Sequence, residues 1–268
     1  MATSQRPIHL LHVDDDPDFA DLTATYLERE NDRFDIETAT SADEGLQRIA
    51  SRPPDCVVSD YDMPGASGIE FLEAVRDQHP ELPFILYTGK GSEAVAGEAV
   101  SAGVTDYIHK QSGTEQYLLL ANRIENAVTN YRSQQAAKRK EQRLELFFEE
   151  SPLGAIQWDA DFNFERMNDR AEEILGYDET ALRGESWERI VADRDRDSVG
   201  DVVEHLLKAD GGTHIINKNV CKDGTIRTCE WHNRAVTDAD GNVQSVFSKF
   251  QASPIVRTAR QNSKSTRR

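Results

Sequence analysis

The first half of the chain alternates short apolar runs with longer segments whose apolar residues recur every three or four positions. The apolar runs, some rich in β-branched residues, predict strands over residues 8–13, 34–39, 56–58, 84–87 and 107–108. The recurring spacing predicts helices over residues 17–30, 42–50, 67–78, 92–102 and onward from about residue 114. Because strand and helix alternate throughout, we expect an α/β domain with a parallel sheet and helices on both faces.

Polar residues mark the starts of two of these helices. Asp16 precedes Pro17, and because proline suits the first helical position, Asp16 is expected to be the cap. Ser41 is expected to cap the helix that begins at Ala42, with Glu44 completing a reciprocal capping box.

The segment from Thr114 to Glu150 contains no glycine or proline. Its apolar stripe is interrupted by the polar stretch RSQQAAKRKEQR and then resumes. The pattern predicts one long helix or two nearly collinear ones. Two roles remain open, a solvated spacer or a signalling helix that dimerises.

A second domain is predicted from Ser151 onward. Two short strand patterns precede short helices, and three longer strand patterns follow, with polar turns at residues 159–163 and 238–242 and a hairpin turn at 222–224. This order predicts an α+β domain, in which an antiparallel sheet has helices on one side. Trp158 and Trp231 are expected to pack in its core.

Polar side chains follow the predicted strands of the first domain. Asp14 and Asp15 follow the first run, Asp60 follows the third, and Lys110 follows the last. In an open α/β sheet, ligands bind at the carboxyl ends of the strands. Carboxylates gathered there repel one another unless a cation neutralises them, and Mg²⁺ suits carboxylate and phosphate oxygens. Lys110 offers positive charge to a phosphoryl group, and a carboxylate nucleophile can form an aspartyl phosphate.

These strand ends resemble the receiver domain of two-component response regulators over roughly the first 130 residues. The motifs that carry the resemblance are HVDDDP with Asp14 and Asp15, SDYDMPG with Asp60, LYTG with Thr88, and DYIHK with Tyr107 and Lys110. The resemblance implies a flavodoxin-like (βα)5 fold. One departure is Gln111, which stands where the family usually has a proline.

The same resemblance implies a phosphorylation site. Asp60 would accept a phosphoryl group from a sensor histidine kinase. Mg²⁺ would be held by Asp14, Asp15, Asp60 and the backbone carbonyl of Asp62.

The remaining motif residues would contact or sense the phosphoryl group. Lys110 would bind it, and Thr88 and Tyr107 would carry the switch between two conformations. Asp62 and Lys90 would modulate how long the phosphoryl group lasts.

The second domain resembles a PAS domain of the sensor-box type over about residues 145–252. The matching stretches are ESPLGAIQWD, NDRAEEILGY after Met167, and KDGTIRTCEW. The resemblance implies a sensory or protein-interaction module whose ligand is unknown. Cys221 and Cys229 fall in strand patterns, whereas flavin-adduct relatives carry their cysteine on a helix, so we expect no covalently bound cofactor. A haem would need an axial ligand, and His205 is the one histidine in a helical pattern of this domain.

Composition narrows the class of protein. The formal net charge of −17 opposes nonspecific binding to nucleic acids and anionic membranes, and favours a salt-adapted protein. Three cysteines, Cys56, Cys221 and Cys229, do not indicate a disulfide framework, and a Cys221–Cys229 metal pair lacks the usual spacing. The sequence has neither a signal peptide pattern nor an apolar run of spanning length, so a cytoplasmic location is expected.

The predicted organisation has five parts. They are a disordered N-terminus at 1–6, the receiver at 7–130, a helical linker at 131–144, the PAS domain at 145–252 and a basic disordered tail at 253–268. We predict a response regulator that is not an enzyme, with a histidine kinase as partner, a possible homodimer through the linker helix, and neither nucleic acid nor membrane bound.

Two alternatives compete with this interpretation. A phosphohydrolase of the haloacid-dehalogenase type would use Asp60 and Asp62 as its Asp-x-Asp motif, but Pro64 stands where that family usually has Thr or Val. A DNA-binding regulator would act through the basic tail, and its binding to a duplex would have to survive moderate salt.

Overall fold

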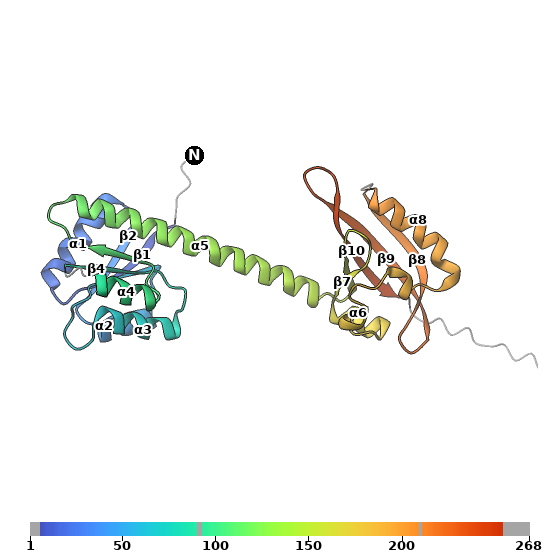
Figure 1. Cartoon of the computed structure of the whole chain (residues 1–268), viewed down its shortest axis with the longest axis horizontal. Helices are drawn as coiled ribbons and strands as arrows, with labels where there is room; N and C mark the ends of the chain where they lie inside the picture. The colour runs from blue at the N-terminus through green and yellow to red at the C-terminus, as the bar shows by residue number, and fades with distance from the viewer. Residues whose placement is uncertain (1–5, 90–92, 209–210, 254–268) are drawn as a thin grey trace, which may run out of the picture. The chain divides into compact units, whose positions relative to one another are not determined.

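The computed structural model describes residues 6–89, 93–208 and 211–253 (Figure 1). The chain divides into two compact units, residues 1–139 and 140–268. Apart from Arg6 and Ser253, the predicted disordered ends lie outside the described residues.

The first unit contains a five-stranded parallel sheet. Its elements are β1 (Ile8–Val13), α1 (Pro17–Glu30), β2 (Phe34–Ala39), α2 (Ala42–Ser51), β3 (Cys56–Ser59), α3 (Gly68–Gln78), β4 (Phe84–Thr88), α4 (Glu93–Ser101), β5 (Asp106–His109) and α5 (Glu115–Glu149). The strand order is β2-β1-β3-β4-β5, and all four neighbouring pairs are parallel. This confirms the predicted flavodoxin-like fold. The order reverses between β1 and β3, and ligands of such sheets bind at that switch point.

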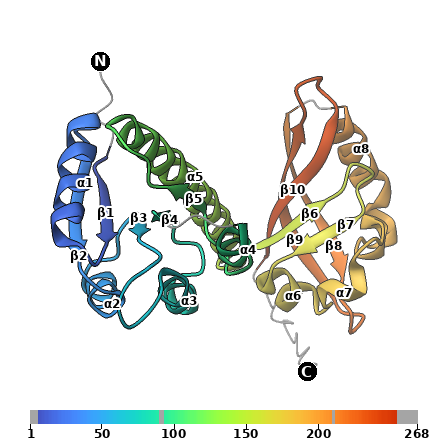
Figure 2. The same ribbon diagram turned by 60° about the vertical axis from the view of Figure 1, so that its left-hand side comes forward.

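Helices cover both faces of this sheet, with α1 and α5 on one side and α2, α3 and α4 on the other (Figures 1 and 2). Alternate residues of β1 enter the two layers. Leu10 packs in the same cluster as Leu27 and Ile124, whereas Leu11 packs with Leu72. Burial of each such side chain contributes roughly 1.5–3 kcal/mol, so the sheet is anchored from both sides.

The predicted capping box at α2 is wrong in one of its two bonds. Ser41 Oγ accepts from Glu44 N at 3.3 Å, but the Glu44 carboxylate accepts from the backbone N of Thr40 at 2.9 Å instead of from Ser41. Because Thr40 also offers its hydroxyl at 3.1 Å, that residue competes better for the carboxylate. The reciprocal box occurs at α3, between Ser67 and Glu70.

The second unit contains a five-stranded antiparallel sheet. Its elements are β6 (Gly154–Trp158), β7 (Phe164–Met167), α6 (Asp169–Leu175), α7 (Glu179–Leu182), η1 (Trp187–Arg189), η2 (Asp193–Asp195), α8 (Arg196–Leu207), β8 (Gly212–Val220), β9 (Ile226–Thr237) and β10 (Val243–Ala252). The strand order is β7-β6-β10-β9-β8, with helices over one face (Figure 2). The predicted α+β fold is therefore confirmed, and Trp158 and Trp231 lie in its core at 2% and 5% exposure.

The predicted hairpin turn joins β8 to β9. Cys221 N donates to Thr225 O at 2.9 Å, and Gly224 adopts a φ of +79°, which glycine tolerates best. Cys221 therefore lies in the turn, and the prediction that it belongs to a strand is wrong. Cys229 does lie in β9, as predicted.

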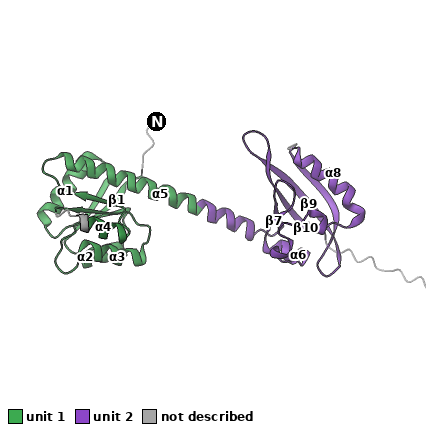
Figure 3. Cartoon of the chain, in the orientation of Figure 1, with its two compact units in different colours: residues 1–139 green, residues 140–268 purple. Residues whose placement is uncertain are grey.

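The long helix α5 is a single element that contributes residues to both units (Figure 3). Its contacts with the body of the first unit extend past the predicted domain end at residue 130. Arg132 donates to both carboxylate oxygens of Asp55 at 3.1 and 2.7 Å, and Lys138 lies 3.3 Å from Glu81. The backbone of His9 also donates to Asp55, at 3.0 Å, so this carboxylate ties α5 to β1.

We predict that Asp55 stabilises the first unit and gives it acid sensitivity. Burial alone would raise the pKa of Asp55, but hydrogen bonds from Arg132 and His9 hold it below its ordinary value. A depressed pKa gives stability that is present at neutral pH and lost as pH falls below about 4. Asp55→Asn should therefore cost about 1–3 kcal/mol in urea unfolding near neutral pH, and should lose less stability than wild type on acidification.

The matched control is Asp35→Asn. Asp35 pairs with Arg52 at 2.8 Å, but both side chains are more than half exposed, so the change should cost about 0–1 kcal/mol. Equal unfolding curves for the two variants would contradict the role given to Asp55.

Candidate functional site

Two buried carboxylates lie side by side at the switch point of the parallel sheet. Val13 and Ser59 are register partners at the ends of β1 and β3, and Asp60 N donates to Val13 O at 2.8 Å. The next residues of the two strands, Asp14 and Asp60, are only 1% and 8% exposed. With the exposed Asp15, they bring one carboxylate oxygen each within 4.8 Å of the others.

Lys110 supplies the positive charge at this cluster. Its Nζ donates to Asp14 Oδ2 at 2.8 Å and lies 3.2 Å from Asp60 Oδ1. The ammonium group also lies 4.4 Å from the centre of the Phe19 ring, which restricts its position further. The contact with Asp60 is an ion pair without hydrogen-bond alignment, and Asp60 Oδ1 accepts no hydrogen bond from the described residues. Beside its ion pair with Lys110, that oxygen can accept a hydrogen bond or bind a cation.

The backbone around Asp60 is held in place by close packing. Ser59 Oγ donates to the carbonyl of Asp60 at 2.8 Å. A Cβ atom on Gly68 would lie 2.2 Å from the same carbonyl, so only glycine fits there. The sequence pattern does not reveal this role of Gly68, because the approach of α3 to Asp60 is a tertiary contact.

The predicted switch residues lie on the two strands beyond β3. Thr88 ends β4 and is 1% exposed, while Tyr107 is half-buried on β5, where burial raises its pKa. Thr88 O accepts from Lys110 N at 2.8 Å, which links the strand end to the lysine. Asp62 is exposed in the loop after β3, and Lys90 lies outside the described residues. The modulating role of this pair stays a prediction.

A buried hydrogen-bond network beneath the Lys110 loop was missed by sequence reasoning. Gln116 Oε1 accepts from the Tyr87 hydroxyl at 2.5 Å and from Gln111 N at 3.0 Å, and its amide nitrogen donates to Gly113 O at 3.0 Å. Gln111 can donate because it is not the proline usual in receiver domains. The sequence shows that Gln111 replaces the usual proline. It gives no signal for Gln116, because a glutamine in the first turn of a helix is ordinary.

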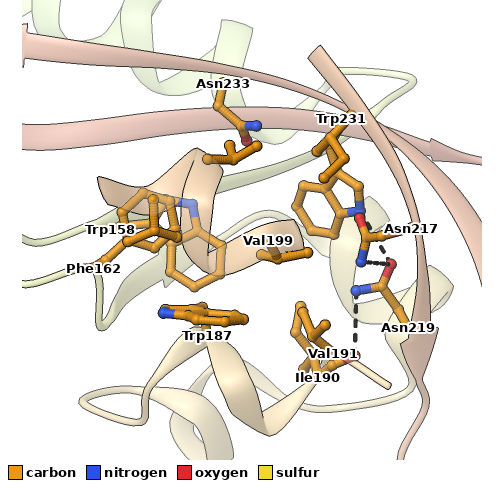
Figure 4. A pocket seen from close by; sticks show the side chains of 13 residues that line it. Trp158, Phe162, Trp187, Ile190, Val191, Val199, Asn217, Asn219, Trp231 and Asn233 are labelled. Carbon is orange, nitrogen blue, oxygen red and sulfur yellow. Dashed lines mark hydrogen bonds between the residues drawn. The ribbon is translucent and has the colours of Figure 1, made fainter. Parts of the chain in front are cut away.

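The second unit encloses a small pocket of about 30 Å³ between its sheet and its helices (Figure 4). Aromatic, aliphatic and amide side chains line it, among them Trp158, Trp187, Trp231, Asn217, Asn219 and Asn233. Trp231 Nε1 donates to Asn219 Oδ1 at 3.1 Å, and Asn219 Nδ2 donates to Ile190 O at 3.2 Å. A pocket of this size has room for water. His205 is exposed on α8 and is not among the lining residues, so it is not placed as a haem ligand.

Comparison with known proteins assigns a family to each unit. Residues 10–122 match the response regulator receiver domain family, and residues 148–250 match the PAS fold family. The chain carries a response regulator receiver domain followed by a PAS domain. Both predicted resemblances are thereby confirmed.

Curated relatives match the receiver domain. The nitrogen assimilation regulatory protein NtrX of Azorhizobium caulinodans is 33% identical over 42% of this chain, and the photosynthetic apparatus regulatory protein RegA of Cereibacter sphaeroides is 35% identical over 40%. These matches span only 25% and 57% of the two relatives.

Solved structures resemble each domain separately. A CheY-like receiver domain protein of Methanospirillum hungatei covers 48% of this chain and 98% of its own, with 27% identity and a TM-score of 0.43. The PAS domain of an HTR-like protein of Haloarcula marismortui covers 46% of this chain and 98% of its own, with 23% identity and a TM-score of 0.40.

The cysteines of both domains are free and buried. Burial raises the pKa of Cys56, and it raises the pKa of Cys229 to about 12. Because a thiolate is the reactive and metal-binding form, these two side chains behave as small apolar groups near neutral pH.

Within the part of the chain that is described, none of the helices combines the length and apolar character needed to cross a bilayer.

Asn168 joins the end of α5 to the PAS domain. Its buried side chain accepts from Ala155 N at 2.8 Å and Ala171 N at 2.9 Å, and donates to Phe148 O at 2.9 Å and Leu153 O at 3.1 Å. All four hydrogen-bonding positions of the amide are thus used. Phe148 belongs to the last turn of α5, so one side chain links that turn to β6 and to the start of α6.

We predict that Asn168→Ala destabilises the PAS domain by roughly 3 kcal/mol or more, because it orphans buried backbone groups at several positions. The measurement is urea unfolding followed by Trp fluorescence. The control is Gln157→Ala on β6, whose amide donates only to Glu165 at the exposed surface, at 2.7 Å. It should cost less than about 1 kcal/mol. A similar loss in the free energy of unfolding for both variants would show that the hydrogen bonds of Asn168 do not stabilise the domain.

Proposed function

We propose that the chain is a response regulator in which Asp60 accepts a phosphoryl group from a phosphohistidine of a sensor histidine kinase. An oxygen of Asp60 attacks phosphorus as the P–N bond to the donor histidine breaks, and the bonding electrons return to the imidazole. The observation that carries this proposal is the buried Asp60 Oδ1, which accepts no hydrogen bond from the described residues and lies 3.2 Å from Lys110. Lys110 then attracts the charge on the transferred group.

The acidic residues around Asp60 fit a hard divalent cation. Asp14, Asp15 and Asp60 supply closely spaced carboxylate oxygens, the ligands that Mg²⁺ prefers, and the backbone carbonyl of Asp62 is proposed as a further ligand. Mg²⁺ would neutralise the negative charge that builds up when a phosphoryl group meets this cluster. Among the described residues, Lys110 pairs with two of these carboxylates, Asp14 and Asp60.

The signal is proposed to pass from Thr88 and Tyr107. The hydroxyl of Thr88 would move toward a phosphoryl oxygen, and the ring of Tyr107 would fill the vacated space. Asp62 and Lys90 would then set the lifetime of the phosphoryl group at the mouth of the site.

The PAS domain is proposed to act as a sensory or protein-interaction output in the cytoplasm. A homodimer through α5 is supported by Leu144 and Phe147, which are 60% and 65% exposed and three residues apart on the helix. The acidic surface favours salt adaptation and disfavours binding to nucleic acid.

The receiver family match over residues 10–122 favours this function over a phosphohydrolase. The basic tail, on which the DNA-binding alternative rests, falls almost entirely outside the described residues.

The first test is phosphorylation by acetyl phosphate with Mg²⁺, followed by intact mass spectrometry. Wild type should gain one phosphoryl group, and Asp60→Asn should gain none. The control Asp77→Asn, at an exposed carboxylate of α3, should label like wild type. Undiminished labelling of Asp60→Asn would reject Asp60 as the acceptor.

A second test separates phosphorylation from switching. Thr88→Ala should still accept the phosphoryl group, because Thr88 does not react, but its amide hydrogen exchange should no longer change on phosphorylation. The control is Thr25→Ala on the exposed face of α1, which should respond like wild type. If Thr88→Ala responds as wild type does, the switch lies elsewhere.

A further inference from the structure

Two histidines and a glutamate gather on the outer face of the PAS sheet, away from the pocket and from the helices. His214 on β8 and His232 on β9 are register partners, and Glu230 precedes His232 by two residues on β9. Because alternate residues of a strand share a face, all three side chains point to the same side. Their side chains are 49%, 62% and 32% exposed, so ions in solution reach them.

The ligand atoms converge on one point. Glu230 Oε1 lies 2.9 Å from His214 Nε2 and 3.7 Å from His232 Nε2. One ligand atom from each of the three residues falls within 4.8 Å of the others. Ligand atoms about 2.0–2.1 Å from a tetrahedral zinc ion are about 3.3 Å apart, so the two distances bracket the required separation.

The glutamate is held by a group outside the cluster. Gln251 on β10 donates to Glu230 Oε2 at 3.1 Å, which leaves Oε1 directed at the histidines. Such outer hydrogen bonds orient the ligands of metal sites. The backbone beneath is rigid as well, since β8 and β9 pair without a register shift from Gly212 to Val220.

Two positive charges on this face oppose a cation: Arg234, two residues after His232 on β9, and Lys249 on β10. Lys249 is the register partner of His232 on β10 and belongs to the same face of the sheet. The flexible stems of both side chains let their charged groups turn toward solvent, so they weaken rather than prevent binding.

We propose that His214, Glu230 and His232 form a binding site for a transition-metal dication of the Zn²⁺ type, with water completing the coordination. Two imidazoles and one carboxylate suit such ions, whereas Mg²⁺ prefers the all-oxygen cluster of the receiver domain. Bound metal would tie β8 to β9 and stabilise the PAS domain. This site is independent of phosphorylation at Asp60.

The probe is Co²⁺, titrated into the full chain without a polyhistidine tag, with excess Mg²⁺ present to occupy the acidic cluster of the receiver. Wild type should bind one Co²⁺ and develop the visible absorption of a site with fewer than six ligands. The double variant His214→Gln/His232→Gln should weaken binding by at least about tenfold. Gln251→Met, which removes only the orienting hydrogen bond, should weaken it by about tenfold.

The matched control is His205→Gln, which removes an exposed histidine on α8 of the same domain and should bind Co²⁺ like wild type. As a second measurement, Zn²⁺ should raise the unfolding temperature of wild type and of His205→Gln but not of the double variant. Equal Co²⁺ affinity in wild type and the double variant would overturn the proposal. An equal rise of the unfolding temperature with Zn²⁺ in wild type and the double variant would overturn it too.

Discussion

The fold of the receiver domain brings two buried carboxylates together, and only part of their repulsion is offset by a nearby lysine. Parallel pairing of β1 with β3 brings Asp14 and Asp60 out of water at one edge of the sheet. Like charges in a low dielectric repel strongly, and the Lys110 ammonium group between them offsets part of that repulsion. A site built this way gains free energy when a further cation binds between the carboxylates.

The surroundings of Lys110 explain why its position is defined. The Phe19 ring lies beneath the ammonium group, and the Gln116 amide ties the loop after the lysine to Tyr87 of β4. Tyr87 is fully buried and shares a cluster with residues of α5. The geometry of the charged site is therefore coupled to the packing of α5 on the sheet, which is a direct physical route from the site to the helix.

The core of the PAS domain contains polar groups, and these groups need hydrogen-bond partners. Trp158 and Trp231 donate to Ser248 and Asn219, and Ser248 donates in turn to Asn233. Buried donors without partners would be costly, so these bonds give a specific arrangement to a core that apolar packing alone would leave less defined. The buried amide of Asn168 is likewise fully hydrogen-bonded, and its four hydrogen bonds join three segments.

The sequence by itself determined both folds and the residues at the strand ends. Strand and helix periodicity, the acidic residues after β1 and β3, and the lysine after β5 are local properties, and each domain has motifs in a fixed order. Only the tertiary structure decided which groups meet across long separations. Gly68 against the Asp60 carbonyl, Gln116 with the Tyr87 hydroxyl, Asp55 with Arg132 of α5, and His214 beside Glu230 join residues between 8 and 77 positions apart. No periodicity records such contacts, because hydrogen bonds and close packing depend on distances in space that only the folded chain establishes.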